Sequence, residues 1–137
     1  MRKWILFSAI AMSCFSCVKS GSVIPNVAVA FQDVTTDPAL RALNTPGGAV
    51  LINGYGVAGL ILYREPDGSY AAYDRCSTVD PSKLCAVTLN AGNFTVTDPC
   101  SGGEWALSNG EPVKAPAVTS LKSYSIDVSN FEIFVSN

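Results

Sequence analysis

Apolar and polar residues alternate in short stretches along most of the chain, and turn sequences separate these stretches. Val27, Val29 and Phe31 alternate with small or polar neighbours, which is the period-2 pattern of a half-buried β-strand. Turn sequences such as Asn53-Gly54 recur about every 8–12 residues, a spacing typical of β-sandwiches and small barrels. The predicted strands cover residues 27–32, 49–52, 57–63, 70–73, 87–89, 94–96, 105–107, 111–113, 124–128 and 132–135.

One segment has the pattern of a helix instead. Asp37 can cap the N-terminus of a helix over residues 37–43, and Pro38 suits its first position. The turn-forming residues 44–48 would end it. The sequence therefore predicts an all-β fold, an antiparallel β-sandwich or small barrel with one short N-terminal helical turn.

The first 16 residues have the pattern of an export signal. Arg2 and Lys3 precede an apolar segment over residues 4–15, which is too short to span a membrane. Serine precedes cysteine at Cys14 and at Cys17, and this resembles the cleavage site of a bacterial lipoprotein signal. That resemblance implies lipid attachment at Cys17, with Cys14 as the alternative. An ordinary secretory signal with incidental cysteines is the competing interpretation.

These features divide the chain into a lipoprotein signal peptide over residues 1–16, a tether over 17–24 and a β domain over 25–137. We expect the protein to be exported and held by its lipid at a membrane of the bacterial cell envelope. Removal of residues 1–16 takes away two basic residues and no acidic ones, which changes the net charge from −2 to −4. The acidic balance argues against nucleic-acid binding.

The chain contains no histidine. This excludes a Ser-His-Asp triad, a histidine acid or base, and zinc or iron held by imidazole. No other recognisable catalytic constellation is present in the sequence, so we expect a protein that is not an enzyme.

From Tyr73 onward, the order of motifs resembles the Rieske iron–sulfur domain. Residues 73–76 (Tyr-Asp-Arg-Cys) resemble the entry to its first cluster loop, and residues 99–105 (Pro-Cys-Ser-Gly-Gly-Glu-Trp) resemble the second loop. Ala115, Pro116 and Ala117 resemble the family's proline loop, and residues 121–124 match the stretch that follows it. Residues 25–61 are similar to small bacterial Rieske-like lipoproteins. The resemblance implies a Rieske-like β domain and, in the family, a [2Fe–2S] cluster that transfers electrons.

The family's cluster ligands are two cysteines and two histidines. By position, the resemblance carries these ligands onto Cys76, Thr78, Asp98 and Ser101. Only Cys76 keeps a soft donor, because hydroxyl and carboxylate oxygens are harder ligands than thiolate or imidazole. We therefore expect that the cluster is lost and that the domain has no cofactor and no metal site.

Three cysteines fall within the domain: Cys76, Cys85 and Cys100. An exported chain favours a disulfide, and three cysteines allow three pairings. The Rieske resemblance implies Cys85–Cys100, with Cys76–Cys100 as the main alternative. Cys76 is then left as a free thiol, either redox-active or metal-binding, or simply a semi-buried residue without a role.

Three functions follow from these observations. The first is a cluster-less Rieske-fold lipoprotein of the cell envelope, a non-enzymatic binding or structural module with a protein partner that the sequence does not identify. The alternative is a Rieske-type [2Fe–2S] electron-transfer protein with non-standard ligation. A further alternative is a thiol-active or metal-binding protein that uses Cys76. The sequence gives no indication of oligomeric state.

Overall fold

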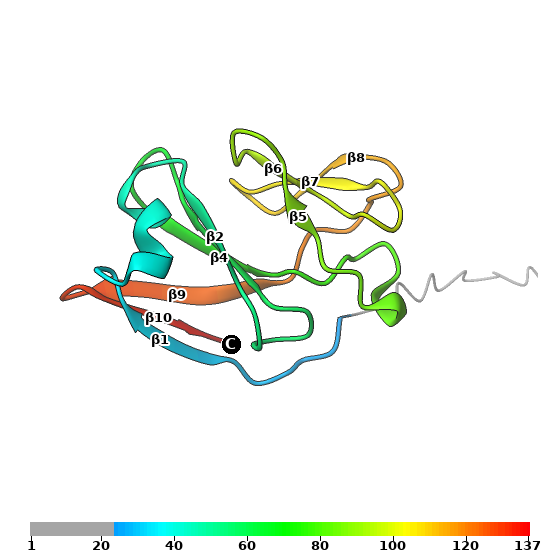
Figure 1. Cartoon of the computed structure of the whole chain (residues 1–137). Helices are drawn as coiled ribbons and strands as arrows, with labels where there is room; N and C mark the ends of the chain where they lie inside the picture. Colours follow the sequence, from blue (N-terminus) through cyan, green and yellow to red (C-terminus); the bar gives the residue numbers. More distant parts are fainter. Residues whose placement is uncertain (1–23) are drawn as a thin grey trace, which may run out of the picture.

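The computed structural model describes residues 24–137 and consists of two antiparallel sheets (Figure 1). The large sheet has the strand order β1-β10-β9-β4-β3-β2. Its strands, in chain order, are β1 (Ala30–Val34), β2 (Ala49–Ile52), β3 (Leu60–Arg64), β4 (Tyr70–Asp74), β9 (Ser123–Ser129) and β10 (Glu132–Ser136).

The second sheet is smaller and has the order β5-β6-β7-β8. Figure 1 shows this sheet on one side of β2 and β4, with β1, β9 and β10 on the other side. The predicted all-β sandwich is therefore confirmed. The four strands are β5 (Thr88–Leu89), β6 (Thr95–Thr97), β7 (Glu104–Ala106) and β8 (Pro112–Lys114).

Strand β3 lies between two hydrophobic cores. Leu60 and Leu62 pack into a core with residues of β1 and β10, whereas Ile61 and Tyr63 pack into a second core that contains Trp105 of the small sheet. All four of these β3 residues are buried. This explains why the strand is continuously apolar instead of alternating, since both of its faces are covered.

The predicted helical turn forms as the 3₁₀ helix η1 (Pro38–Asn44). The Asp37 side chain accepts a hydrogen bond of 2.6 Å from the backbone nitrogen of Ala39, as expected of an N-cap. Leu40 and Leu43 are buried in the first core. A second 3₁₀ turn, η2 (Pro81–Lys83), lies in the loop after β4 and was not predicted.

The predicted strand over residues 57–63 begins three residues too early, because β3 starts at Leu60. The backbone nitrogens of Val57 and Ala58 donate hydrogen bonds to the side chain of Asp74, at 2.7 and 3.1 Å. These contacts turn the chain before the strand begins. The partner lies 16 to 17 residues away in the sequence, so a local apolar pattern could not reveal it.

Residues near the two ends of the described chain hold each other in place. The Asn137 side chain accepts a hydrogen bond from the Val29 nitrogen and donates to Asn26 Oδ1 and the Val27 carbonyl. Lys122 Nζ donates to the Pro25 carbonyl. These side-chain hydrogen bonds therefore hold the first described residues of the domain against its C-terminal part.

The signal peptide over residues 1–16, the lipid attachment at Cys17 or Cys14, and nearly all of the tether lie outside the described residues. The division of the chain into residues 1–16, 17–24 and 25–137 stays a prediction. Within residues 24–137, no helix has the length and apolar character needed to cross a membrane.

Candidate functional site

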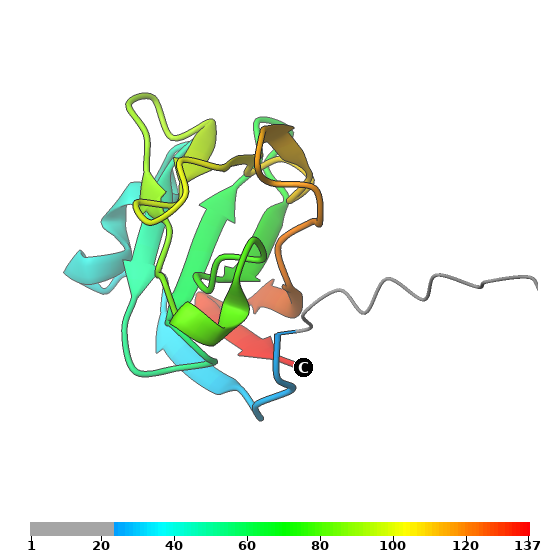
Figure 2. The same ribbon diagram turned by 90° about the vertical axis from the view of Figure 1, so that its right-hand side faces the viewer.

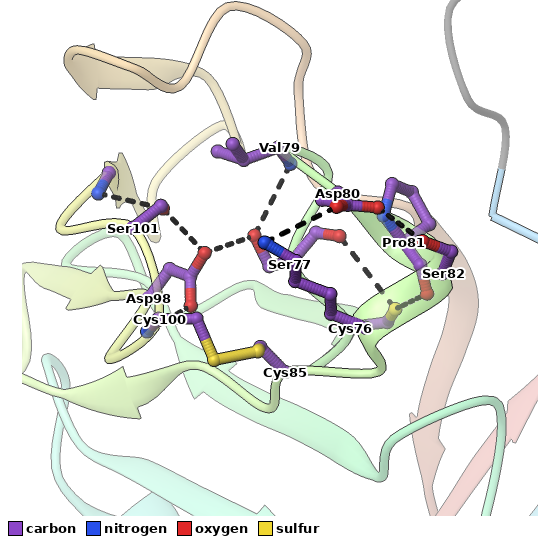
Figure 3. Close-up of a disulfide and its surroundings, with 12 residues drawn as sticks. Cys76, Ser77, Val79, Asp80, Pro81, Ser82, Cys85, Asp98, Cys100 and Ser101 are labelled. Atoms are coloured by element: carbon purple, nitrogen blue, oxygen red, sulfur yellow. Dashed lines mark hydrogen bonds and ion pairs between the residues drawn. A yellow bond between two sulfur atoms is a disulfide. The ribbon is translucent and has the colours of Figure 1, made fainter.

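Two loops meet at one end of the molecule. The first follows β4 and contains η2, and the second connects β6 to β7. Figure 2, a view onto this end, shows the η2 loop in front of the large sheet. A disulfide joins Cys85 of the first loop to Cys100 of the second, with their Cα atoms 6.3 Å apart (Figure 3). This is the pairing favoured from the sequence, and Cys76 is left as a free cysteine.

Asp98 lies at the centre of the hydrogen bonds between the loops. Its side chain is 2% exposed. It accepts hydrogen bonds from Ser77 Oγ at 2.7 Å, Ser101 Oγ at 2.5 Å and the Cys100 nitrogen at 2.8 Å. Burial alone would raise the pKa of Asp98, but these hydrogen bonds outweigh it and lower the pKa below its usual value. Asp98 therefore carries a negative charge at neutral pH.

Asp74 holds the beginning of the first loop. It is fully buried and accepts a hydrogen bond of 2.8 Å from the Cys76 nitrogen and one of 2.7 Å from the Tyr124 hydroxyl. Together with the contacts from residues 57 and 58, these bonds satisfy a buried carboxylate that has no cationic partner in the described chain. Asp74 thus fixes where the loop with Cys76 leaves the sheet.

Cys76 is buried, and its thiol points away from the disulfide (Figure 3). Its sulfur lies 3.7 Å from the Ser77 carbonyl oxygen and 3.8 Å from that of Pro81. Burial raises the pKa of Cys76 to about 11, and the negative charges of Asp74 and Asp98 add to the shift. The thiol is therefore protonated at neutral pH, which argues against a nucleophilic role for Cys76.

The remaining positions that the Rieske resemblance singled out have different surroundings. Thr78 Oγ1 donates a hydrogen bond of 2.6 Å to the Thr119 carbonyl, which also accepts one of 2.8 Å from Trp105 Nε1. The proline loop, Ala115 to Ala117, contains a cis Ala115–Pro116 peptide bond. It lies against the second loop, because a Cβ atom on Gly103 would be 3.1 Å from the Ala117 Cβ.

Three possible ligand side chains converge between the loops. One ligand atom each from Cys85, Asp98 and Cys100 lies within 4.8 Å of the other two. Of the four positions carried over from the family, the structure therefore places only Asp98 in this group, while Ser101 contacts it through a hydrogen bond. Sequence reasoning treated Cys85 and Cys100 only as a disulfide. Their closeness to Asp98 in space depends on how the two loops pack, which the sequence does not show.

Sequence comparison identifies the family. No family model matches the chain. The chain is 30% identical to Ferredoxin CarAc of Metapseudomonas resinovorans over 91 residues, which cover 66% of this chain and 82% of that protein. The chain belongs to the Rieske-like domain family.

Solved structures agree with the Rieske-like fold. The plasma membrane Rieske protein PetC3 from Synechocystis PCC 6803 matches with a TM-score of 0.58 at 22% identity, over 82% of this chain and 100% of that one. The chain matched in the complex of reduced oxygenase and oxidized ferredoxin in carbazole 1,9a-dioxygenase has a TM-score of 0.52 at 22% identity, over 80% of this chain and 99% of that one. At this identity, the two structures support the fold alone.

The expectation of a lost cluster and no cofactor is corrected by these findings. It rested on the absence of histidine and on the donor types at Cys76, Thr78, Asp98 and Ser101. The sequence relative is a ferredoxin, and the structure brings two sulfur atoms and a carboxylate together at the loops. A missing histidine pair therefore does not establish that this Rieske-like domain lacks a cluster. The comparisons favour the electron-transfer alternative over the cluster-less binding or structural module.

Proposed function

We propose that this Rieske-like protein is an electron carrier, rather than a catalyst, and that it holds a [2Fe–2S] cluster with ligands other than histidine. The observation that carries the proposal is the group formed by Cys85, Asp98 and Cys100, whose ligand atoms lie within 4.8 Å of one another. Membership of a family that includes a ferredoxin supports it. A bound [2Fe–2S] cluster supplies one-electron redox chemistry.

Once the disulfide is reduced, this group would supply three of the four protein ligands that a [2Fe–2S] cluster takes. Two thiols form when Cys85 and Cys100 take up two electrons and two protons from a dithiol reductant. Thiolate is the ligand that iron–sulfur clusters prefer, and the charged Asp98 adds an oxygen donor. Cys100 is exposed, which gives a reductant access to the bond.

The chain's own residues would position these ligands. Ser77 and Ser101 donate to Asp98 Oδ2, so they fix the orientation of the carboxylate and keep it charged. The Asp98–Gly102 and Asp98–Gly103 backbone hydrogen bonds, both 2.8 Å, close the second loop around it. Because these contacts are independent of the disulfide, we expect the loops to keep their arrangement when the disulfide opens.

Anaerobic reconstitution tests the proposal. The full-length protein is reduced with a dithiol, supplied with ferrous iron and sulfide, and desalted; iron, acid-labile sulfide and visible absorbance are then measured. We expect about two irons and two sulfides per folded chain. Asp98→Asn and Cys100→Ser should lower the bound iron, whereas Asp80→Asn, which alters an exposed aspartate of the first loop outside the group, should not. A folded protein without bound iron and sulfide would contradict the proposal.

An electron carrier needs a redox partner, and the end with the two loops is the surface that we propose for it. Pro99 and Pro116 are exposed there, as are the apolar side chains of Leu84 and Val118, at 57% and 77%. Replacing Thr78, Pro99, Ser101 or Pro116 with a charged residue should prevent a partner from co-purifying. Unchanged co-purification would contradict this choice of surface.

We also propose that the carrier is exported and lipid-anchored in the bacterial cell envelope through Cys17, with Cys14 as the alternative. The basic and apolar pattern of residues 1–16 supports this. Metabolic labelling with a radioactive fatty acid should mark the wild-type chain and fail to mark Cys17→Ala. Labelling that is lost only in Cys14→Ala would move the anchor to that residue.

A further inference from the structure

A polar groove of about 390 Å³ lies at the other end of the large sheet from the disulfide. It is lined by residues of the β1–η1 turn, the end of η1, the adjoining ends of β3 and β4, and the β9–β10 hairpin. Figure 1 shows these segments together at one end of the large sheet. Arg64, at the last position of β3, lines it, whereas Leu60 at the first position pairs with Asp74 next to the Cys76 loop. The groove is therefore separate from the proposed electron-transfer site.

Arg64 is the one charged residue among those that line the groove. It forms no salt bridge within residues 24–137. Its Nη1 atom donates to the carbonyl oxygens of Leu43 and Asn44, at 3.2 and 3.0 Å, and the guanidinium lies 5.4 Å from the centre of the Tyr70 ring. These contacts hold the side chain in one place.

The opposite edge of the guanidinium is unused. Nε is buried and has no hydrogen-bond partner in the described part of the chain, and Nη2 donates no hydrogen bond there either. Nε and Nη2 together form the side edge of an arginine, which binds the two oxygens of a carboxylate through parallel hydrogen bonds. An unpaired buried donor is costly, so a ligand that reaches it would gain from pairing it.

Phe131 gives the groove an apolar wall at a conformational cost. Asn130 and Phe131 form the two-residue turn of the β9–β10 hairpin, with φ angles of 51° and 63°. Glycine is preferred at the second position of such a turn, because a bulky residue is strained at positive φ. Phe131 is nevertheless present, with its side chain 76% exposed and lining the groove. A strained, exposed aromatic residue points to a role in binding.

We propose that this groove binds a small organic carboxylate that has an aromatic or aliphatic body. The carboxylate would pair with Nη2 of Arg64 and, once the atoms that now bury Nε move aside, with Nε as well. The body would lie against Tyr70 and Phe131. Thr35 and Ser129 also line the groove. The Thr35 hydroxyl can donate to the same oxygens, whereas the Ser129 hydroxyl donates to Asp127 at 3.3 Å. The volume lies within the range of small-molecule sites.

Titration of the full-length protein with benzoate, followed by NMR, tests the proposal. We expect saturable shifts at the Arg64 Nε–H signal and at the backbone amides of Thr35 and Ser129. Benzamide has the same shape without the charge and should produce none of them. Shifts that do not saturate, or an equal response to benzamide, would contradict the proposal.

Matched variants locate the site. Arg64→Gln should weaken benzoate binding by about tenfold or more, and Arg64→Lys should weaken it as well, because an ammonium lacks the paired donors. Phe131→Gly should weaken binding without lowering the thermal stability, since glycine suits the turn. Arg41→Gln, at an exposed arginine of η1, is the control and should bind as the wild type does.

Inorganic phosphate distinguishes a carboxylate site from a general anion site. Phosphate should compete weakly with benzoate, and the affinity for phosphate should be unchanged in Phe131→Gly. Phosphate binding that is tighter than benzoate binding would contradict the carboxylate assignment, and so would benzoate binding that is unchanged in Arg64→Gln.

Discussion

Ser77 Oγ lies 2.7 Å from Asp98 Oδ2 and donates a hydrogen bond to it, across the two loops that the disulfide also joins. The loops are therefore connected twice, once by a covalent bond and once by a buried bond to a charged group. Hydrogen bonds to charged groups are among the stronger ones in proteins. This second connection allows the site to persist when the covalent one is reduced.

The charge of Asp98 should make the stability of the domain depend on pH. Its pKa in the folded protein is lowered from the usual value of 3.8, so its stabilisation is fully present above about pH 4 and is lost as pH falls through the lower folded value. Asp98→Asn should reduce the free energy of unfolding by about 2 kcal/mol at pH 7. Urea unfolding between pH 7 and pH 2 should show the difference from the wild type shrinking in acid.

Asp80→Asn is the control for this experiment, because Asp80 also accepts a side-chain hydrogen bond, from Ser82, but is not buried. Its effect on stability should be smaller than that of Asp98→Asn at every pH. A difference between wild type and Asp98→Asn that stays constant down to pH 2 would contradict the assigned role of the charge.

Reduction of the Cys85–Cys100 disulfide should destabilise the domain without unfolding it. The bond closes a loop between residues 15 apart, which corresponds to about 3 kcal/mol of stabilisation in the chain-entropy description. Urea unfolding with and without a phosphine reductant measures this value. Cys76→Ser should respond to the reductant as the wild type does, because Cys76 is not part of the bond. Complete loss of structure on reduction would show that the hydrogen bonds between the loops are insufficient.

Two tyrosines allow a hydrogen bond to a charged group to be compared with one to a neutral group. Tyr124 donates to the Asp74 carboxylate at 2.7 Å, and Tyr73 donates to the Leu107 carbonyl at 2.9 Å. Burial raises the pKa of both hydroxyls, and the Asp74 charge raises that of Tyr124 further. Tyr124→Phe should cost about 2 kcal/mol of unfolding free energy, against about 1 kcal/mol for Tyr73→Phe. The reverse order in urea unfolding would contradict the role given to Asp74.

Cys76 should react slowly with alkylating reagents in the folded protein. With a pKa of about 11, on the order of one thiol in a thousand is ionised at pH 8, and burial restricts access further. Mass spectrometry after treatment with iodoacetamide should show alkylation of Cys76 only in urea or well above pH 9. Rapid alkylation of the native protein at pH 8 would restore the hypothesis of a reactive thiol.

The sequence predicts features that depend on neighbouring residues. Asp37 and Pro38 indicate a helical turn and form one, and alternating residues around Phe31 predict a strand that is present. The sequence does not show contacts between distant segments. The hydrogen bonds from residues 57 and 58 to Asp74 shorten a predicted strand, and Ser77, which was not among the candidate site residues, turns out to hold Asp98.

The same limit explains the incorrect expectation about the cofactor. The expectation assumed that any cluster ligands would stand at positions 76, 78, 98 and 101, which match the ligand positions of the family. The group that forms in space instead takes Asp98 from one of these positions and Cys85 and Cys100 from outside them. Which sulfur atoms lie near a carboxylate depends on how two loops pack, and that is a property of the tertiary structure.

The contacts of Asn137 have a mechanical consequence. Asn137 and Lys122 hold residues 25–29 through side-chain hydrogen bonds, and this segment leads directly into β1 at the edge of the large sheet. A pulling force applied at residue 24 would load these few bonds before it reached the β1–β10 hydrogen bonds. The segment would therefore yield first and lengthen the connection, while the two cores and the loops around Asp98 stayed intact.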